Sequence, residues 1–233
     1  MPSLSGVKFR GRLIWQALTL PFSRLVTHPV GEMSLPDFLA GLLPGVPMPP
    51  ADLPGDPTAL AHAGATVIES SERGVARTLY FLARTLQSQH VLEVGVYRGF
   101  TTAYLAAATA ETGGTVHLAD LSADALAIAA KTALLRHDRV KTYQGLSTDP
   151  TLIAKVPGPL DLIYLDADHS EDGVYAELEA WWPRVRIGGV IAIHDAINIA
   201  GICRTVNRWA AQHPVLTMAT GRGSGLALFK KAI

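Results

Sequence analysis

The sequence predicts an α/β protein with a doubly wound, mostly parallel sheet of seven strands. The main observation is that short apolar runs alternate along the chain with longer segments rich in alanine and leucine. This alternation is typical of the strands and crossover helices of parallel sheets. The first run, 91–94, is largely apolar, as expected of a strand covered on both faces. The last two runs flank the glycine-rich stretch 221–225 and predict a closing antiparallel hairpin.

The predicted elements follow one another from residue 65. The stretch 65–87 has helical spacing, with an apolar stripe formed by Val67, Val75, Leu79, Leu82 and Leu86. The five parallel strands are expected at 91–94, 115–119, 140–144, 160–165 and 190–193. The later helices are expected at 103–110, 123–136, 175–182 and 199–212, and the hairpin strands at 215–219 and 226–229.

Residues 1–64 are a different kind of sequence, rich in proline in their second half. Prolines forbid a continuous helix or a central strand. Short helices are still possible, and Trp15, Phe22 and Phe38 offer apolar side chains for packing. We therefore predict a helical N-terminal appendage over 1–64, which caps the site or builds a dimer, and one domain over 65–233. A disordered tail is the alternative for the appendage.

The composition excludes several classes of protein. The formal net charge is +0, which offers no basic surface for nucleic acid and no polybasic face for a membrane. Apolar runs are too short to span a bilayer. The run 13–20 follows basic residues, but Pro21 and Arg24 cut it short and no cleavage site follows. The single cysteine, Cys203, rules out an intramolecular disulfide. We expect a cytoplasmic protein.

The stretch 91–102 joins the first strand to the next helix through a turn that contains Gly95 and Gly99. A strand, a glycine turn and a helix in this order place backbone N–H groups and the positive end of a helix dipole beside a ligand. Val96 stands where a dinucleotide fingerprint requires its second glycine. The spacing therefore argues against NAD or FAD, and the lack of a following Gly-Lys-Ser/Thr excludes a Walker loop.

The motif Glu93-Val-Gly95-x-x-x-Gly99 resembles the first motif of class I S-adenosylmethionine-dependent methyltransferases, whose fold is Rossmann-like. The segments 161–169 and 188–195 are similar to a metal-dependent O-methyltransferase branch that includes catechol, caffeoyl-CoA and macrolide-sugar (macrocin) enzymes. The resemblance covers residues 65–233. It implies S-adenosylmethionine as cofactor and a hydroxyl group of a small molecule as acceptor.

Ligands of open α/β sheets bind beyond the carboxyl ends of the strands. The predicted strands end at Gly95, Asp120, Gly145, Asp166 and the pair His194–Asp195, so polar residues and glycines gather at one edge. Asp120 has the position of a carboxylate that binds ribose hydroxyls, although it or a neighbouring serine could instead cap the next helix.

The resemblance assigns a cofactor-binding set at this edge. Ser147 corresponds to a residue that bonds an adenine nitrogen, and Ser70 to one near the methionine end, although Ser70 could also be a plain helix cap. The whole set is Ser70, Glu93, Gly95, Tyr97, Gly99, Thr101, Asp120, Leu121, Ser147 and Asp166.

Two carboxylates, Asp166 and Asp195, are expected to converge, and they would repel unless they are protonated or bridged by a cation such as Mg²⁺. The resemblance adds His194 to this metal set, in a place where an oxygen ligand is usual; a base or a substrate contact is its other possible role. His169 stands three residues after Asp166, the offset at which related enzymes carry their general base, and histidine titrates near neutrality.

We therefore expect a metal-assisted, S-adenosylmethionine-dependent O-methyltransferase that uses His169 as its base. The pairing of His194 with Asp195 resembles the enzymes that modify sugars and antibiotics, so a sugar or another polyhydroxyl acceptor is favoured. We also expect a homodimer. Two alternatives stay open: a nicotinamide-dependent oxidoreductase on the same kind of sheet, and a non-catalytic interaction protein with a methyltransferase fold.

Overall fold

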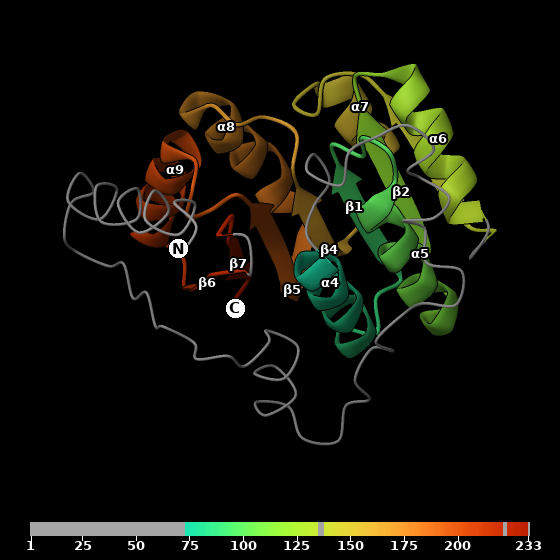
Figure 1. Cartoon of the computed structure of the whole chain (residues 1–233), viewed down its shortest axis with the longest axis horizontal. Coiled ribbons are helices and arrows are strands. Elements are labelled where there is room, and N and C mark those ends of the chain that lie inside the picture. Colours follow the sequence, from blue (N-terminus) through green and yellow to red (C-terminus); the bar gives the residue numbers. More distant parts are fainter. Residues whose placement is uncertain (1–72, 135–137, 221–222, 233) are drawn as a thin grey trace, which may run out of the picture.

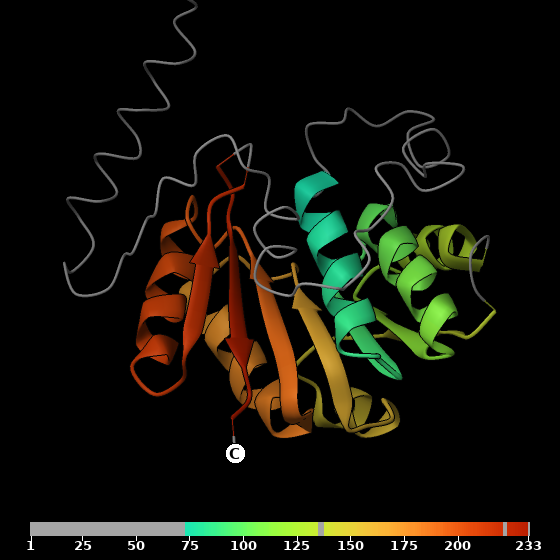
Figure 2. The ribbon, with the colours of Figure 1, turned by 90° about the horizontal axis from the view of Figure 1, so that it is seen from below.

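The computed structural model describes residues 73–134, 138–220 and 223–232. The predicted appendage over 1–64, the start of the helix predicted from residue 65, and Ser70 all lie outside these ranges. The described chain forms three layers, with a sheet between two layers of helices (Figure 1 and Figure 2). Among the described residues, no helix is long and apolar enough to cross a membrane.

The central layer is a seven-stranded sheet in the order β3-β2-β1-β4-β5-β7-β6. Strands β1 to β5 are parallel, and β7 runs antiparallel to both β5 and β6. The predicted fold class is therefore confirmed, including the closing hairpin. The strands are β1 (His90–Val94), β2 (Thr115–Asp120), β3 (Val140–Gln144), β4 (Leu160–Leu165), β5 (Val185–His194), β6 (Val215–Met218) and β7 (Leu226–Lys230).

Helices cover both faces of the sheet. One apolar cluster packs α4 (Arg73–Thr85), α5 (Phe100–Thr112) and α6 (Ala123–Leu134) against one face. A second cluster covers the other face with residues from α7 (Pro150–Lys155), α8 (Glu171–Trp181) and α9 (Ala200–Ala210). Neighbouring residues of one strand belong to different clusters, as Val91 and Leu92 do, and both are fully buried. Burial on both faces explains why the strands look like largely apolar runs in the sequence.

Two helices differ from the sequence prediction because side chains cap them. Helix α7 was not predicted; it begins where the Asp149 side chain accepts a hydrogen bond from the N–H of Thr151, with Pro150 in the first turn. Helix α8 starts at Glu171, earlier than the predicted residue 175, because Ser170 caps it and accepts from the N–H of Gly173. The residue that follows α8 enters a short 3₁₀ turn, η1 (Trp182–Arg184).

Strand β5 is longer than predicted, since it begins at Val185 rather than at residue 190. Gly188 and Gly189 lie inside the strand, ahead of its predicted start. A Cβ atom on Gly189 would lie 2.9 Å from the carbonyl oxygen of Asp161 in the neighbouring strand β4. The glycine is therefore needed for a close backbone approach within the sheet, and the predicted boundary was wrong.

Candidate active site

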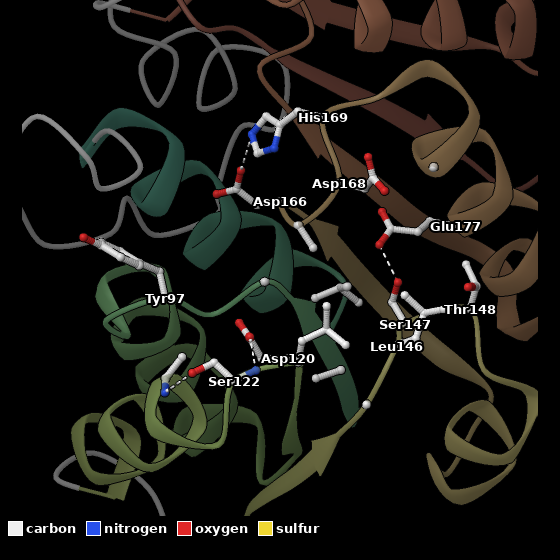
Figure 3. A pocket seen from close by; sticks show the side chains of 18 of the residues that line it. Tyr97, Asp120, Ser122, Leu146, Ser147, Thr148, Asp166, Asp168, His169 and Glu177 are labelled. Atoms are coloured by element: carbon white, nitrogen blue, oxygen red, sulfur yellow. Dashed lines mark hydrogen bonds and ion pairs between the residues drawn. The ribbon is translucent and has the colours of Figure 1, made fainter.

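A cavity of about 760 Å³ opens at the carboxyl edge of the parallel strands. Its walls come from the ends of β1 to β4, from α6 and from the first turns of α8, and they include Gly95, Asp120, Ser147, Asp166 and His169. Figure 3 shows Asp166 and His169 at one end of the cavity, Asp120 and Ser122 at another, and Ser147 and Thr148 on a third side. The strand-end residues singled out in the sequence are thus neighbours in space.

The turn between β1 and α5 depends on both of its glycines. Gly95 and Gly99 have positive φ angles of 83° and 77°. A Cβ atom on Gly95 would lie 2.4 Å from the carbonyl oxygen of Asp166, and one on Gly99 would lie 2.8 Å from the Cα of Ala129. The sequence suggested that these glycines make room for a ligand. In the structure they make room first for the protein's own backbone, which holds the turn against β4 and α6.

Three residues of the predicted cofactor set, Glu93, Gly99 and Thr101, lie behind the cavity wall rather than in it. Glu93 is 1% exposed and accepts a hydrogen bond of 2.5 Å from Thr102 Oγ1. Burial is the main reason that the pKa of Glu93 rises to about 8. The described members that do line the cavity are Gly95, Tyr97, Asp120, Leu121, Ser147 and Asp166.

Asp120 connects the turns that follow β1 and β2. Its Oδ2 accepts from the N–H of Val96 at 2.9 Å, and its Oδ1 accepts from the N–H of Ser122 at 2.8 Å. Ser122 is the residue that caps α6, because its hydroxyl accepts from the N–H of Ala125. Each carboxylate oxygen can accept more than one hydrogen bond, so Asp120 keeps acceptor capacity toward the cavity.

One side of the cavity is apolar except for a buried polar pair. Leu121 and Leu146 line it and are 66% and 55% exposed. Beside Leu146, the Ser147 hydroxyl donates to Oε1 of Glu177 on α8 at 2.5 Å. Glu177 was missed in the sequence, although an acid among Val174, Leu178 and Trp181, which form the buried stripe of α8, is a detectable signal.

At the other end of the cavity, Asp166 accepts two hydrogen bonds. Its Oδ2 accepts from the hydroxyl of Tyr164 at 3.0 Å, and its Oδ1 lies 3.0 Å from Nδ1 of His194. His169 Nε2 lies 3.3 Å from Oδ2 of Asp195 and 3.9 Å from Oδ1 of Asp166. His169 lines the cavity with a side chain that is 43% exposed, whereas His194 and Asp195 lie behind it.

His169 and Asp195 shift each other's pKa toward the charged form. The hydrogen bond to Asp195 is the main reason that the pKa of His169 is raised. Burial opposes the ionisation of Asp195, but the hydrogen bond from His169 and the nearby His194 outweigh it and lower the pKa of Asp195. Asp195 also has a positive φ of 55°, a backbone conformation that is uncommon outside glycine and that often marks functional positions.

The donor atoms at this end fit a divalent cation. One ligand atom each from Asp166, His169 and Asp195 lies within 4.8 Å of the others. The sequence-based set held His194 in place of His169. His194 is 8% exposed, and its Nδ1 lies 3.0 Å from Asp166 Oδ1 and 3.7 Å from Asp195 Oδ2, so its role as a metal ligand stays a prediction. Two carboxylates and an imidazole are donors that Mg²⁺, Mn²⁺ or Zn²⁺ accept.

Comparisons with known proteins agree with the fold and the cavity. A family model described as a methyltransferase domain matches residues 92–196. The catechol O-methyltransferase of Mycobacterium tuberculosis is 34% identical over 164 residues, which cover 64% of this chain and 70% of that protein. Cofactor-bound Rv0187 from MTB is 25% identical with a TM-score of 0.65, over 84% of this chain and 96% of that one.

A further solved structure supports the same architecture. An O-methyltransferase from Bacillus cereus in complex with SAH (S-adenosylhomocysteine) has a TM-score of 0.65 at 19% identity, covering 85% of this chain and 98% of its own. The fold is thus that of class I methyltransferases. The chain belongs to the S-adenosylmethionine-dependent O-methyltransferase family. S-adenosylmethionine is accordingly its cofactor, and a small molecule with a hydroxyl group is its acceptor.

Proposed function

We propose that this enzyme methylates one of several neighbouring hydroxyl groups of a sugar or other polyhydroxyl compound, with His169 as the general base. The observation that carries this proposal is the position of His169. Its imidazole lines the cavity at the end of β4, and Nε2 lies 3.3 Å from Asp195 Oδ2. A base at a cavity wall with a carboxylate partner is the arrangement that proton abstraction from a hydroxyl requires.

The polar and apolar sides of the cavity support one position for the cofactor. Asp120 would bind the ribose hydroxyls, and the exposed side chains of Leu121 and Leu146 would cover the faces of the adenine. Ser147 would contact the adenine edge. This placement brings the sulfonium methyl group toward Asp166 and His169, which Figure 3 shows at a separate end of the cavity from Asp120.

Neutral His169 would take the hydroxyl proton as the acceptor oxygen attacks the methyl carbon. The C–O bond forms as the C–S bond of the sulfonium breaks, and S-adenosylhomocysteine leaves as the neutral thioether. The imidazolium that results is stabilised by Asp195 and Asp166, whose oxygens lie 3.3 and 3.9 Å away. The protein thus supplies orientation, a base and charge stabilisation.

Metal assistance is part of the proposal. A divalent cation bound by Asp166 and Asp195 would act as a Lewis acid on the acceptor hydroxyl. Tyr164 and His194 hydrogen-bond Asp166 and hold its carboxylate in place. The same carboxylates stabilise protonated His169 when no cation is bound, so a cation and a protonated His169 would compete for them.

A catechol is the second candidate acceptor. The relative from Mycobacterium tuberculosis is named a catechol O-methyltransferase. A catechol shares with a sugar the pair of adjacent hydroxyl groups that a cation and a base can engage together. We further propose that residues 1–64 form a separate appendage to a domain at 65–233, that the enzyme is a homodimer, and that it works in the cytoplasm.

The test is methyl transfer from isotopically labelled S-adenosylmethionine to a panel of sugars and catechols, followed by mass spectrometry. We expect a labelled product that depends on Mg²⁺ and disappears in excess EDTA. His169→Ala should lower kcat at least about 100-fold while its affinity for S-adenosylhomocysteine stays within about twofold of the wild type. Asp172→Asn, an exposed change on α8 outside the cavity, is the control.

Different outcomes would contradict different parts of the proposal. Full turnover in EDTA would refute metal assistance and leave the base in place. Normal turnover by His169→Ala would refute the base. If catechols are methylated and sugars are not, the preferred acceptor class is wrong, although the chemistry stands.

A further inference from the structure

Glu177 lines the cavity, although it is almost fully buried. Glu177 is 2% exposed, and its Oε1 accepts the hydrogen bond from Ser147. Its Oε2 has no hydrogen-bond partner within the described residues. Burying a carboxyl group with an unpaired oxygen costs free energy that leucine at this helix position would not cost. Function therefore explains the acid at this position better than packing does.

Ser147 connects this carboxyl group to the cavity. It follows the end of β3, lies between Leu146 and Thr148, and all three residues line the cavity. Figure 3 shows the Glu177 side chain reaching from α8 to the Ser147 hydroxyl, with Leu146 and Thr148 next to it. The direction of the Ser147 hydroxyl therefore determines which hydrogen bond it can form with a ligand on this side of the cavity.

The hydrogen bond to Glu177 fixes what Ser147 can offer a ligand. A serine hydroxyl has one proton to donate and two lone pairs that accept. When the proton points to Glu177 Oε1, only the accepting side of Ser147 Oγ is left for the cavity. The group recognised there must then be a hydrogen-bond donor. Adenine presents an amino group at its 6-position, whereas hypoxanthine presents a carbonyl oxygen there.

We propose that Glu177 is a positioning residue that holds the Ser147 hydroxyl as an acceptor, and so selects the 6-amino group of adenine over the 6-oxo group of hypoxanthine. This inference rests on the proposed placement of the cofactor's adenine beside Ser147. Glu177 would thus influence cofactor specificity indirectly, by orienting the Ser147 hydroxyl.

The protonation state of Glu177 decides the conditions of the test. Burial is the main reason that its pKa rises to about 7. The hydrogen bond from Ser147 and the nearby His169 lower the pKa, while Asp168 and Asp166 raise it. A protonated carboxyl group could donate to Ser147 and release the serine proton. Binding is therefore best measured at about pH 8.5, where the carboxylate is ionised and can only accept.

The experiment compares S-adenosylhomocysteine with S-inosylhomocysteine by isothermal titration calorimetry on the full chain. The wild type should bind the adenosyl compound at least about tenfold more tightly, the usual effect of one mismatched hydrogen bond. Glu177→Leu should bring the two dissociation constants to within about threefold of each other, because the serine hydroxyl can then rotate and donate. Glu177→Gln should keep the preference, since its amide oxygen can still accept the serine proton.

A double-mutant cycle separates this role from a structural one. Ser147→Ala should lose the preference, and Glu177→Leu added to it should change the preference no further. Glu179→Leu, a matched change at an exposed position of the same helix, should behave as the wild type. Glu177→Met serves as the apolar variant if Glu177→Leu does not fold, as judged by circular dichroism.

Two outcomes would overturn this inference alone, and a third would also refute the proposed placement of the cofactor. A wild type without preference, or a Glu177→Leu protein with an unchanged preference, would show that Glu177 does not select the base. If the wild type binds neither compound, the proposed placement of the cofactor fails, and this inference fails with it.

Discussion

At the scale of single residues, burial and partners decide which acids of this protein carry charge. Asp195 is paired with His169, and its pKa is lowered, so it is ionised at neutral pH. Glu93 and Glu177 are more deeply buried, and their pKa values rise to about 8 and about 7. Chemically similar side chains thus differ in how readily they ionise, according to where the fold places them.

Glu93 should make the stability of the protein depend on pH. Its pKa in the folded state, about 8, is above the ordinary value of 4.5, so folding favours its protonated form. The stability that this preference contributes is complete below about pH 4.5 and is lost as the pH rises toward 8. We expect the free energy of unfolding of Glu93→Gln to fall less over this range than that of the wild type. Urea unfolding at a series of pH values measures the difference.

The amide oxygen of Glu93→Gln can still accept the hydrogen bond from Thr102, so the fold should tolerate this change. Glu179→Gln is the control, because Glu179 is exposed. Parallel profiles for the wild type and Glu93→Gln would contradict the assigned pKa.

At the scale of elements, glycines position the turn that builds the cavity. Gly99 combines a φ of 77° with a Cβ position 2.8 Å from the Cα of Ala129 on α6. Gly113 ends α5 with a φ of 72°, but nothing lies within 4 Å of its Cβ position. Gly74 has open space around it in α4 and no positive φ. Gly99 therefore combines backbone strain with close packing, Gly113 shows backbone strain alone, and Gly74 shows neither.

Alanine substitution should therefore be most destabilising at Gly99, less so at Gly113, and stabilising at Gly74. We expect Gly99→Ala to destabilise the fold by roughly 2–4 kcal/mol, because strain and overpacking add. Gly113→Ala should cost about 1 kcal/mol from strain alone. Gly74→Ala should stabilise by about 0.5–1 kcal/mol, since alanine favours helix. Chemical denaturation gives all three values, and equal effects at Gly99 and Gly113 would refute the close packing against α6.

At the scale of the whole molecule, the sheet brings the ends of several strands to one edge. Asp120 follows β2, Ser147 follows β3 and Asp166 follows β4, and all three line one cavity. The order β3-β2-β1-β4 places the β1 turn, with Gly95, between the other strand ends. A ligand in this cavity contacts segments from distant parts of the sequence, so its binding should stabilise the fold as a unit.

The cofactor should therefore raise the melting temperature. At a concentration about 100 times its dissociation constant, S-adenosylhomocysteine would add about 2.7 kcal/mol to the stability of the folded state. For a chain of this size we expect an increase of about 5–10 °C in a thermal unfolding scan. NADH at the same concentration should have no effect, because the turn lacks the second glycine of a dinucleotide site. A shift with NADH alone would instead support the oxidoreductase alternative.

Much of the fold could be predicted because its signals are local. Strands β1, β2 and β4 are short runs that are largely buried on both faces, and each is followed by or ends at a glycine or a polar residue. Parallel strands share one edge for their carboxyl ends, so the meeting of Asp120, Asp166 and Gly95 followed from the strand assignments alone. The start of β5 was missed because glycines weaken the sequence pattern of a strand, and only the neighbouring strand shows that Gly189 makes a close backbone contact.

The sequence by itself determined the order of the elements, the glycine turn and the acids at the strand ends. Only the tertiary structure decided how these side chains pair. It joined His169 to Asp195 and His194 to Asp166, and it brought Glu177 from α8 to Ser147, 30 positions away in the chain. The physical reason is that elements form from local spacing and burial, whereas the direction of a side chain, and hence its partner and its pKa, depends on the packing of segments that the sequence keeps apart.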